Sequence, residues 1–426
     1  MMNISPLSWK ADWPKSRQRF VNWWQQRGCL IGGWCTNPKN DASHEPVEAV
    51  TCASRAARFT DPALRARINH YELTHRHFWG DLIPVSDTNI GPGSLALLAG
   101  AEPGFAESTV WFDPCWHELE EPESLPPIRF NPANRWWQIH EDTARQSAAL
   151  GAGKYLVGMP DLEENIDILC ALRSPQVVMM DLIERPEWVK QKVDEINELF
   201  FSSFDRLYDI IKLPDGSMCS GSFLLWGPGR TAKVQCDASA MFSPDMFREF
   251  IIPPLSRQCD WLDCSMYHLD GTQAIHHLDA LLEIKSLDAI EWTPQAGIEE
   301  GGHPRWYPLY RRILAAGKSV QAVCVKAQEV LPLLEATGPD GMYILAEFEN
   351  EAEAENIIRE VNRRPSRIQE YLNFEIRYSN VRYSIVQKLW RFGRLIDSGH
   401  PLRRTSYSWN ANFAIRRIRM RKSGRF

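Results

Sequence analysis

The stretch SPDMFREFIIPPLSRQCDWL (243–262) decides the fold, because it is a helical pattern set between two short apolar runs. Its apolar residues recur three and four positions apart, and Ser243 followed by Pro244 is a typical helix start. The flanking runs, KVQCDAS (233–239) and SMYHLDG (265–271), end in Ser or Gly, as strands that lead into loops do. A strand, a helix and a second strand in this order predict two parallel strands joined by a right-handed crossover.

The same alternation runs through most of the chain. Further short apolar runs are LIGGWC (30–35), DLIPVSD (81–87), KYLVGMP (154–160), AIEWTP (289–294), SVQAVC (319–324) and MYILAEF (342–348). Eight runs in about 335 residues match an α/β fold of the (β/α)8 TIM-barrel type. We predict one barrel over 28–362, after an N-terminal helical extension (1–27) and before a basic C-terminal tail (363–426). A doubly wound open sheet is the alternative, but no GxGxxG motif follows the first run.

Composition places the chain among folded enzymes. The sequence is 24 % charged and 44 % hydrophobic, which excludes a disordered chain. It has no apolar run of about 18 residues that would span a membrane. The start lacks the apolar segment of a secretory signal, so we expect a cytoplasmic protein. Its 10 cysteines form no CxxC pair, so we expect no disulfide framework. The 17 tryptophans predict a roomy aromatic cavity or a dimer interface.

Charge divides the chain unevenly. Residues 363–426 contain 16 Lys and Arg against 3 Asp and Glu, a surplus of +13, which leaves −19 on the remainder. The tail interleaves Arg with Tyr, Trp and Phe, as nucleic-acid-binding segments do, but it carries no RNA-binding signature. We therefore expect no nucleic acid partner. We expect this tail to be an appended, poorly ordered segment or the product of an altered reading frame.

The predicted strand ends supply the candidate functional residues, since the loops at the carboxyl ends of barrel strands carry the chemistry. His268 and Asp270 are the first choice, because they lie two positions apart on one strand and so face the same side. Glu291 beside Trp292 suits a cationic or methylated ligand. For each candidate, a helix cap, a turn or a core salt bridge is the structural alternative. The remaining candidates at these ends are Asp81, Asp161, Asp237 and Ser239.

The stretch 236–297 resembles the uroporphyrinogen decarboxylase superfamily. It has Asp237-x-Ser239 before a Ser-Pro-x-x-Phe-x-x-Phe helix, followed by a Pro-rich turn, a short strand, a leucine-rich helix and a second strand. The segment FWGDLIPV (78–85) is similar to the superfamily's second strand, which carries an acid. The resemblance implies a (β/α)8 barrel, in agreement with the number of predicted strands.

The superfamily contains decarboxylases and methyltransferases. The decarboxylases hold a tetrapyrrole with many carboxylates and use arginines after the first strand and an aspartate after the second. Here the first loop, CTNPKNDASHEP (35–46), has one Lys and no Arg, although Asp81 matches the aspartate. Several of the methyltransferases bind zinc through a His-x-Cys motif. This chain reads His268-Leu269-Asp270, and zinc accepts a carboxylate oxygen as well as a thiolate.

The resemblance therefore implies a methyltransferase that moves a methyl group from a small methoxylated or methylamine-type compound to a corrinoid protein or a thiol. The alternatives are a decarboxylase of uroporphyrinogen or another carboxylated ring compound, and a non-catalytic barrel that binds a tetrapyrrole or a corrinoid. We expect a small-molecule substrate, a possible homodimer and no membrane contact. The catalytic candidates are Asp81, His268 and Asp270, the candidate Zn2+ ligands are His268, Asp270 and Glu291, and the candidates for substrate binding are Asp161, Asp237, Ser239 and Trp292.

Overall fold

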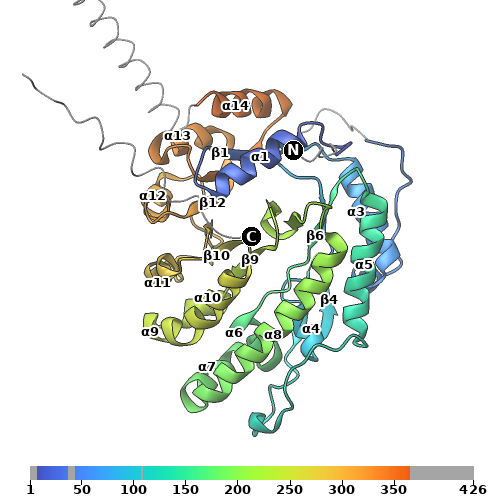
Figure 1. Ribbon diagram of the computed structural model, residues 1–426, viewed down its shortest axis with the longest axis vertical. Coiled ribbons are helices and arrows are strands. Elements are labelled where there is room, and N and C mark those ends of the chain that lie inside the picture. Colours follow the sequence, from blue (N-terminus) through green and yellow to red (C-terminus); the bar gives the residue numbers. More distant parts are fainter. Residues whose placement is uncertain (1–6, 37–43, 107–108, 365–426) are drawn as a thin grey trace, which may run out of the picture. The chain divides into compact units, whose positions relative to one another are not determined.

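The computed structural model describes residues 7–36, 44–106 and 109–364, in which strands and helices alternate (Figure 1). All of the predicted tail after residue 364 lies outside the described residues. The strands are β1 (Cys29–Cys35), β2 (Trp79–Gly80), β3 (Val85–Ser86), β4 (Glu102–Phe105), β5 (Val110–Asp113), β6 (Leu156–Met159), β7 (Met218–Ser220), β8 (Leu225–Gly227), β9 (Thr231–Gln235), β10 (Cys264–Asp270), β11 (Ala289–Thr293), β12 (Ser319–Lys326) and β13 (Met342–Phe348). The helices are α1 (Trp13–Trp24), α2 (Arg55–Thr60), α3 (Pro62–Thr74), α4 (Leu95–Ala99), α5 (Arg135–Gly151), α6 (Asn165–Arg173), α7 (Pro175–Glu184), α8 (Pro186–Ile211), α9 (Pro244–Met246), α10 (Ile252–Trp261), α11 (Leu278–Glu283), α12 (Tyr307–Ala315), α13 (Ala327–Thr337) and α14 (Glu351–Arg363).

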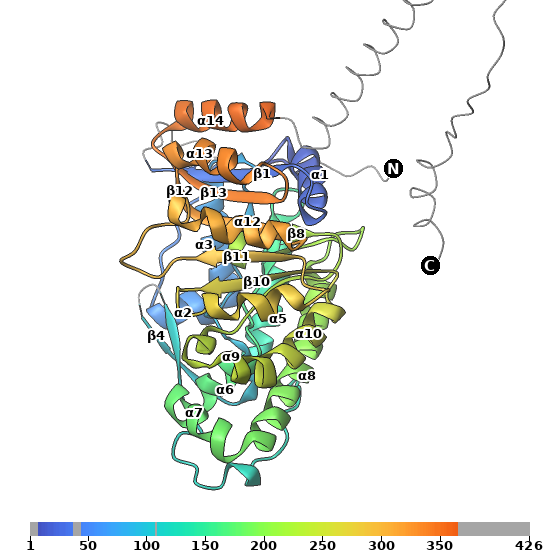
Figure 2. The same cartoon turned by 90° about the vertical axis from the view of Figure 1, so that its left-hand side faces the viewer.

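The strands form two main sheets, and most of their neighbours are parallel. The larger sheet has the order β2-β1-β13-β12-β11-β10-β9, in which only the β2–β1 pair is antiparallel. Figure 2 shows β1, β13, β11 and β10 of this sheet. The smaller sheet has the order β3-β6-β7-β8, and β4 and β5 form a separate hairpin. The α/β class follows the prediction. Among the residues that the structure describes, no ladder joins the two main sheets, so closure into a barrel is not shown.

Proline and local turns explain where elements differ from the predicted runs. The run 233–239 leaves the strand after Gln235 and enters the 3₁₀ helix η3 (Asp237–Met241). The helical pattern 243–262 is divided into α9, a π-helical turn η4 (Phe247–Ile251) and α10. The division precedes two consecutive prolines at the start of α10, whose missing N–H groups cannot continue the helix ladder.

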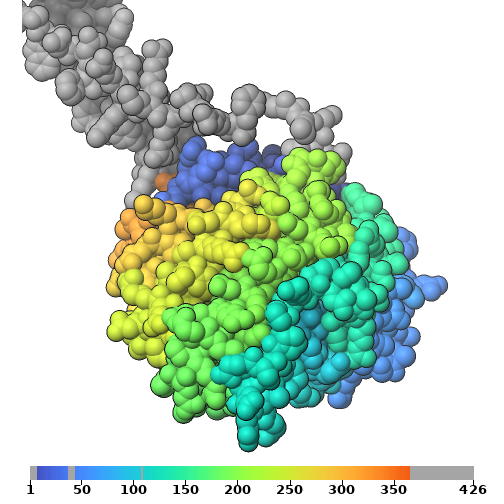
Figure 3. All heavy atoms as spheres, turned by 60° about the horizontal axis from the view of Figure 1, so that its bottom comes forward, coloured from blue at the N-terminus to red at the C-terminus, as the bar shows by residue number. Residues whose placement is uncertain are grey.

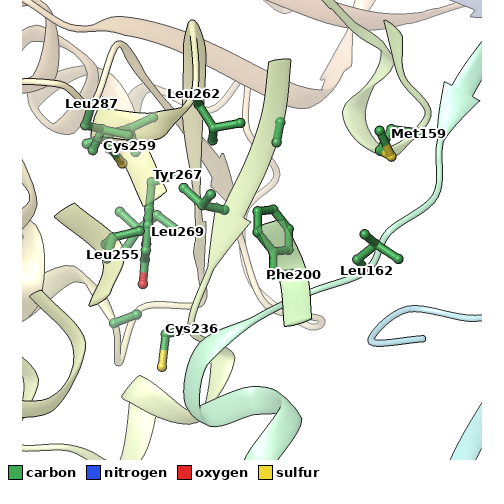
Figure 4. Packing of buried hydrophobic residues seen from close by; sticks show 14 of the residues in the cluster. Met159, Leu162, Phe200, Cys236, Leu255, Cys259, Leu262, Tyr267, Leu269 and Leu287 are labelled. Atoms are coloured by element: carbon green, nitrogen blue, oxygen red, sulfur yellow. The ribbon is translucent and has the colours of Figure 1, made fainter. Parts of the chain in front are cut away.

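The strands have apolar side chains on both faces. On the outer face, Tyr267 and Leu269 of β10 pack with Leu255 and Cys259 of α10 in one large cluster (Figure 4). Because side chains alternate along a strand, the intervening His268 points to the opposite, inner face. Helices α7 and α8, which belong to the outer layer, form part of the green surface shown in Figure 3.

The inner cluster draws residues from both main sheets and is closed at one end by α1. Trp13, Phe20 and Trp23 of this helix pack against residues near the amino-terminal ends of the strands, such as Leu30 and Tyr343. The Nε1 of Trp23 donates to the carbonyl oxygens of Val320 and Gly341, at 3.3 and 3.0 Å. The predicted N-terminal extension therefore contains a helix that completes the core.

The largest fully buried side chains include several tryptophans, so they fill the core rather than an aromatic cavity. The cysteines at all 10 positions are free, as expected. Of the described helices, none combines the length and apolar character that crossing a membrane requires. The fully buried tryptophans are Trp13, Trp23, Trp137, Trp226 and Trp292.

Candidate functional site

A row of polar residues crosses the larger sheet on its inner face. In the parallel registers, His268 on β10 lies beside Gln235 on β9 and beside Glu291 on β11. Glu291 in turn lies beside Gln321 on β12. On β10 and β11 the neighbours of His268 and Glu291 toward the amino-terminal ends, Met266 and Ala289, are apolar and fully buried. The inner face therefore changes from apolar to polar toward the carboxyl ends of the strands, where an α/β protein places its functional groups.

His268 is held by a carboxylate. Its Nδ1 donates a hydrogen bond to Oε2 of Glu291, which is fully buried. The other oxygen of Glu291 accepts a hydrogen bond of 2.6 Å from the hydroxyl of Thr293. Burial lowers the pKa of His268, but the charge and hydrogen bond of Glu291 outweigh it, so the net pKa is raised. This arrangement fixes the ring so that Nε2 is free to bind a ligand.

Nε2 of His268 faces two further carboxylates. It lies 3.9 Å from Oδ1 of Asp237, the first residue of η3. One possible ligand atom from each of Asp237, His268 and Asp270 lies within 4.8 Å of the others, so these three residues form a candidate metal site. Desolvation and then the nearby charge of Asp167 raise the pKa of Asp237 to about 6.

Asp167 of α6 fixes the position of Asp237. Its carboxylate accepts hydrogen bonds from the backbone N–H groups of Asp237 and Ala238, at 2.7 and 2.9 Å. It also accepts a weaker bond of 3.3 Å from Nε2 of Gln235. These contacts cap the start of η3, so the strand ends at Gln235 and the side chain of Asp237 turns toward His268.

A buried lysine lies next to this group. The Nζ of Lys233 on β9 is paired with Oδ1 of Asp161 at 2.7 Å and donates to Oε1 of Gln235. Burial lowers the pKa of Lys233, but Asp161 and Glu163 outweigh it, so the ammonium stays charged. Glu164 accepts a hydrogen bond of 2.6 Å from the backbone N–H of Gln235, and burial raises its pKa to about 8.

The structure brings five of the predicted site residues close together. His268, Asp270 and Asp237 come together, and Glu291 supports His268 but is not one of the three grouped metal ligands. Asp161 lies beside them as the partner of Lys233.

Asp81, Ser239 and Trp292 lie elsewhere. Asp81 is buried before β3, where it pairs with Arg19 of α1 and accepts a hydrogen bond of 3.2 Å from the backbone N–H of Ile31, near the amino-terminal end of β1. The carbonyl of Ser239 lies 2.9 Å from Nε2 of His277, which ties η3 to the following segment. Trp292 packs on Trp306, with ring centroids 4.8 Å apart, on the face opposite Glu291.

Several residues of the site were not predicted. Lys233 and Gln235 alternate with buried apolar residues inside one predicted strand, a pattern that marks an inner polar face. Glu163 and Glu164 lie in the loop after β6, a few residues beyond the strand end. The site's aromatic contact is Phe223, whose ring centroid lies 4.8 Å from that of His268. Phe223 lies in the connection between β7 and β8, and it was missed because none of the predicted strands covers these two strands.

Comparisons with known proteins give little further help. No protein family model matches the chain, and no curated protein matches its sequence. A solved structure, a methyltransferase from Methanosarcina mazei, is similar with a TM-score of 0.48 and 12 % identity, over 71 % of this chain and 85 % of that one. A likeness at this level assigns neither a fold nor an activity to the chain.

Proposed function

We propose that the chain is a methyltransferase that moves a methyl group from a small methylated donor to a thiol or a corrinoid protein. The observation that carries the proposal is the grouping of Asp237, His268 and Asp270, whose ligand atoms lie within 4.8 Å of one another. The resemblance of 236–297 to a superfamily with zinc-dependent methyltransferases supports it, since these three residues all lie in that stretch.

The residues present fit zinc. One imidazole nitrogen and two carboxylate oxygens form a donor set that zinc accepts, and three protein ligands leave a position open for a reactant. The hydrogen bond from Nδ1 of His268 to Glu291 is the support that histidine ligands commonly have. When bound, zinc would lower the pKa of a thiol or a water molecule and so supply a nucleophile.

The chain's own groups orient the site and handle protons. In the neutral form of His268 the hydrogen bond to Glu291 keeps the proton on Nδ1, so the lone pair of Nε2 is available on the side of Asp237. Asp167 holds Asp237 in place through the backbone of η3. Without a metal, Asp237 with a pKa of about 6 can give a proton to a departing alkoxide or amine.

Decarboxylation of a polycarboxylated ring fits the site less well. Such a substrate needs cationic partners, because each buried carboxylate without one is costly. The lysine that the structure places here, Lys233, is already paired with Asp161. A substrate carboxylate would also lie beside Asp237 and Asp270 and be repelled by them.

Metal content is the decisive measurement. We would compare zinc in the purified protein, in a His268→Ala/Asp270→Ala double variant and in a His75→Ala/Asp260→Ala control, in which both replaced residues are exposed. We expect near-stoichiometric zinc in the wild type and the control and its loss from the site variant. Methyl transfer to a thiol or a reduced corrinoid should be lost with it.

Two other results would redirect the proposal. If the double variant retained zinc, the metal would not be bound by His268 and Asp270, and the proposed metal site would be wrong. If the wild type transfers no methyl group, and the double variant binds a tetrapyrrole or a corrinoid as tightly as the wild type does, the results would instead favour a non-catalytic binding protein.

A further inference from the structure

Two adjoining cavities lie between α1 and α14, which Figure 1 and Figure 2 both show at the same end of the molecule. Their volumes are about 520 and 210 Å³, and Arg19 and Asn362 line both of them. The larger one falls within the range of about 300–1,000 Å³ that is usual for small-molecule sites. None of Asp237, His268 and Asp270 lines either cavity, so this place is separate from the candidate site.

The lining of the two cavities is strongly positive, although the body of the chain is acidic. Six cationic side chains line them against two acidic ones, Asp12 and Glu355, so their formal charge is 6 − 2 = +4. Residues 1–362 as a whole carry −19. A positive concave surface raises the local concentration of anions. We call the two cavities together the α1–α14 groove, and its cations are Lys15, Arg19, Arg27, Arg359, Arg363 and Arg364.

The acids of the chain neutralise only half of these cations. Arg19 is paired with the buried Asp81, and the last two arginines of the groove are paired with glutamates. Of the two acids in the lining, Asp12 is already paired with Lys10 at 3.0 Å, so only Glu355 could balance a further cation. A bound anion would relieve the repulsion among the rest. The cations that have no ion-pair partner among the described residues are Lys15, Arg27 and Arg359.

Arg19 is held in place where the two cavities adjoin. Its Nε donates a hydrogen bond of 2.7 Å to Oδ1 of Asp81, and its Nη2 donates one of 3.3 Å to Oγ of Ser16. An anion that binds this side chain therefore loses little affinity to immobilising it. The planar guanidinium group also matches the geometry of phosphate and carboxylate groups.

The larger cavity has an apolar wall as well. Trp79 of β2 and Ile358 of α14 line it, and both side chains are half-buried. The ring of Trp79 is stacked on that of His77, with 5.7 Å between the centroids and 30° between the planes. Ligand sites commonly combine such apolar walls with a few polar groups that fix the orientation of the ligand. The cavity therefore suits an anion that has an apolar or aromatic part.

We infer that the α1–α14 groove binds a small molecule with two or more phosphate or carboxylate groups. The tail of the chain does not complement the groove in charge, because residues 365–426 contain 14 Lys and Arg against 3 Asp and Glu. A ligand that contacts cations of both helices would tie α1 to α14. Since it binds the folded protein, it would also stabilise the fold.

The test compares a groove variant with a variant of equal charge. Isothermal titration calorimetry on the full chain would measure the binding of inorganic tripolyphosphate, ATP and citrate. Lys15→Ala/Arg359→Ala removes two exposed, unpaired cations of the larger cavity, and Arg67→Ala/Lys285→Ala removes two exposed cations outside the groove. We expect at least one of the three anions to bind the wild type and the control equally. It should bind the groove variant at least about 10-fold more weakly.

The three anions identify the chemistry of the ligand. ATP that binds more tightly than tripolyphosphate would support a ligand with an aromatic part, and Trp79→Leu should then remove the difference. Equal affinity of these two would support recognition of phosphate groups alone, and binding of citrate alone would support a carboxylate ligand. The bound anion should also raise the Tm of the wild type, a readout that needs no variant.

Four outcomes would overturn the inference. One is that none of the three anions binds the wild type. Another is that the groove variant and the control bind them with the same affinity, because the basic tail would then account for binding. A third is an unchanged Tm at saturating anion. The fourth is binding of oligothymidylate without binding of any of the small anions, which would indicate a nucleic-acid surface instead.

Discussion

Replacing Glu164 by Gln should stabilise the protein at neutral pH, although it removes a buried hydrogen-bonding carboxylate. Burial raises the pKa of Glu164 from 4.5 to about 8. A carboxyl group whose pKa is higher in the folded than in the unfolded protein destabilises the fold once the pH permits its ionisation. This penalty is absent below pH 4.5, grows as the pH rises and levels off above about pH 8.

The size of the effect follows from the same two pKa values. At about 1.4 kcal/mol per pH unit, ionisation costs the wild type about 1 kcal/mol at pH 5 and about 3 kcal/mol at pH 7. The Gln side chain does not ionise, and its Oε1 can still accept the hydrogen bond from the backbone N–H of Gln235. Glu164→Gln should therefore gain about 2 kcal/mol over the wild type between pH 5 and pH 7.

Urea unfolding at pH 5, 6, 7 and 8 measures this difference directly. Glu118→Gln, at a side chain that is 95 % exposed, is the matched control and should show no trend with pH. A Glu164→Gln variant whose stability relative to the wild type stays constant from pH 5 to pH 7 would refute the reasoning. In that case Glu164 would be ionised in the folded state and balanced by Lys233.

Three further substitutions test other parts of the structure. Glu291→Gln removes the charged support of His268 and should lower zinc affinity about 10- to 100-fold, measured by competition with a chelator; unchanged affinity would contradict its supporting role. Lys233→Met should destabilise the protein by about 3–5 kcal/mol, because acids buried around the lysine lose their partner; a loss below about 1 kcal/mol in urea unfolding would contradict this. Asp81→Asn should cost about 1–3 kcal/mol through its contact with Arg19 and leave methyl transfer unchanged; a lost activity with an intact fold would return Asp81 to the catalytic group.

The sequence predicts the parts of the fold that depend on local pattern. The predicted apolar runs coincide with strands β1, β6, β10, β11, β12 and β13. A short run of apolar residues between loop-forming residues is typical of a buried strand. The helical pattern over 243–262 coincides with α9, η4 and α10. Which strands meet across the two sheets depends on long-range pairing, and no local pattern contains that information.

The site was predictable to the extent that it lies on regular strands. His268 and Asp270 share an inner face because strand side chains alternate, and the sequence shows that alternation. The turn at Asp237 could not be predicted, because Asp167 caps it from a helix 70 residues earlier in the chain. Asp81 was predicted to be catalytic because it is a carboxylate in a loop after a strand. Its partner Arg19 lies 62 residues away in the sequence, so no local pattern could show that the two residues are paired.

The position of α1 has a consequence for biosynthesis. Its apolar face, with Trp13, Phe20 and Trp23, leaves the ribosome first, but Gly341, which accepts a hydrogen bond from Trp23, follows 318 residues later. At a synthesis rate of roughly 5–20 residues per second, Gly341 is made on the order of 15–60 s after Trp23. During this interval the tryptophan-rich face of α1 lacks these partners, so a holding chaperone would find a binding surface there.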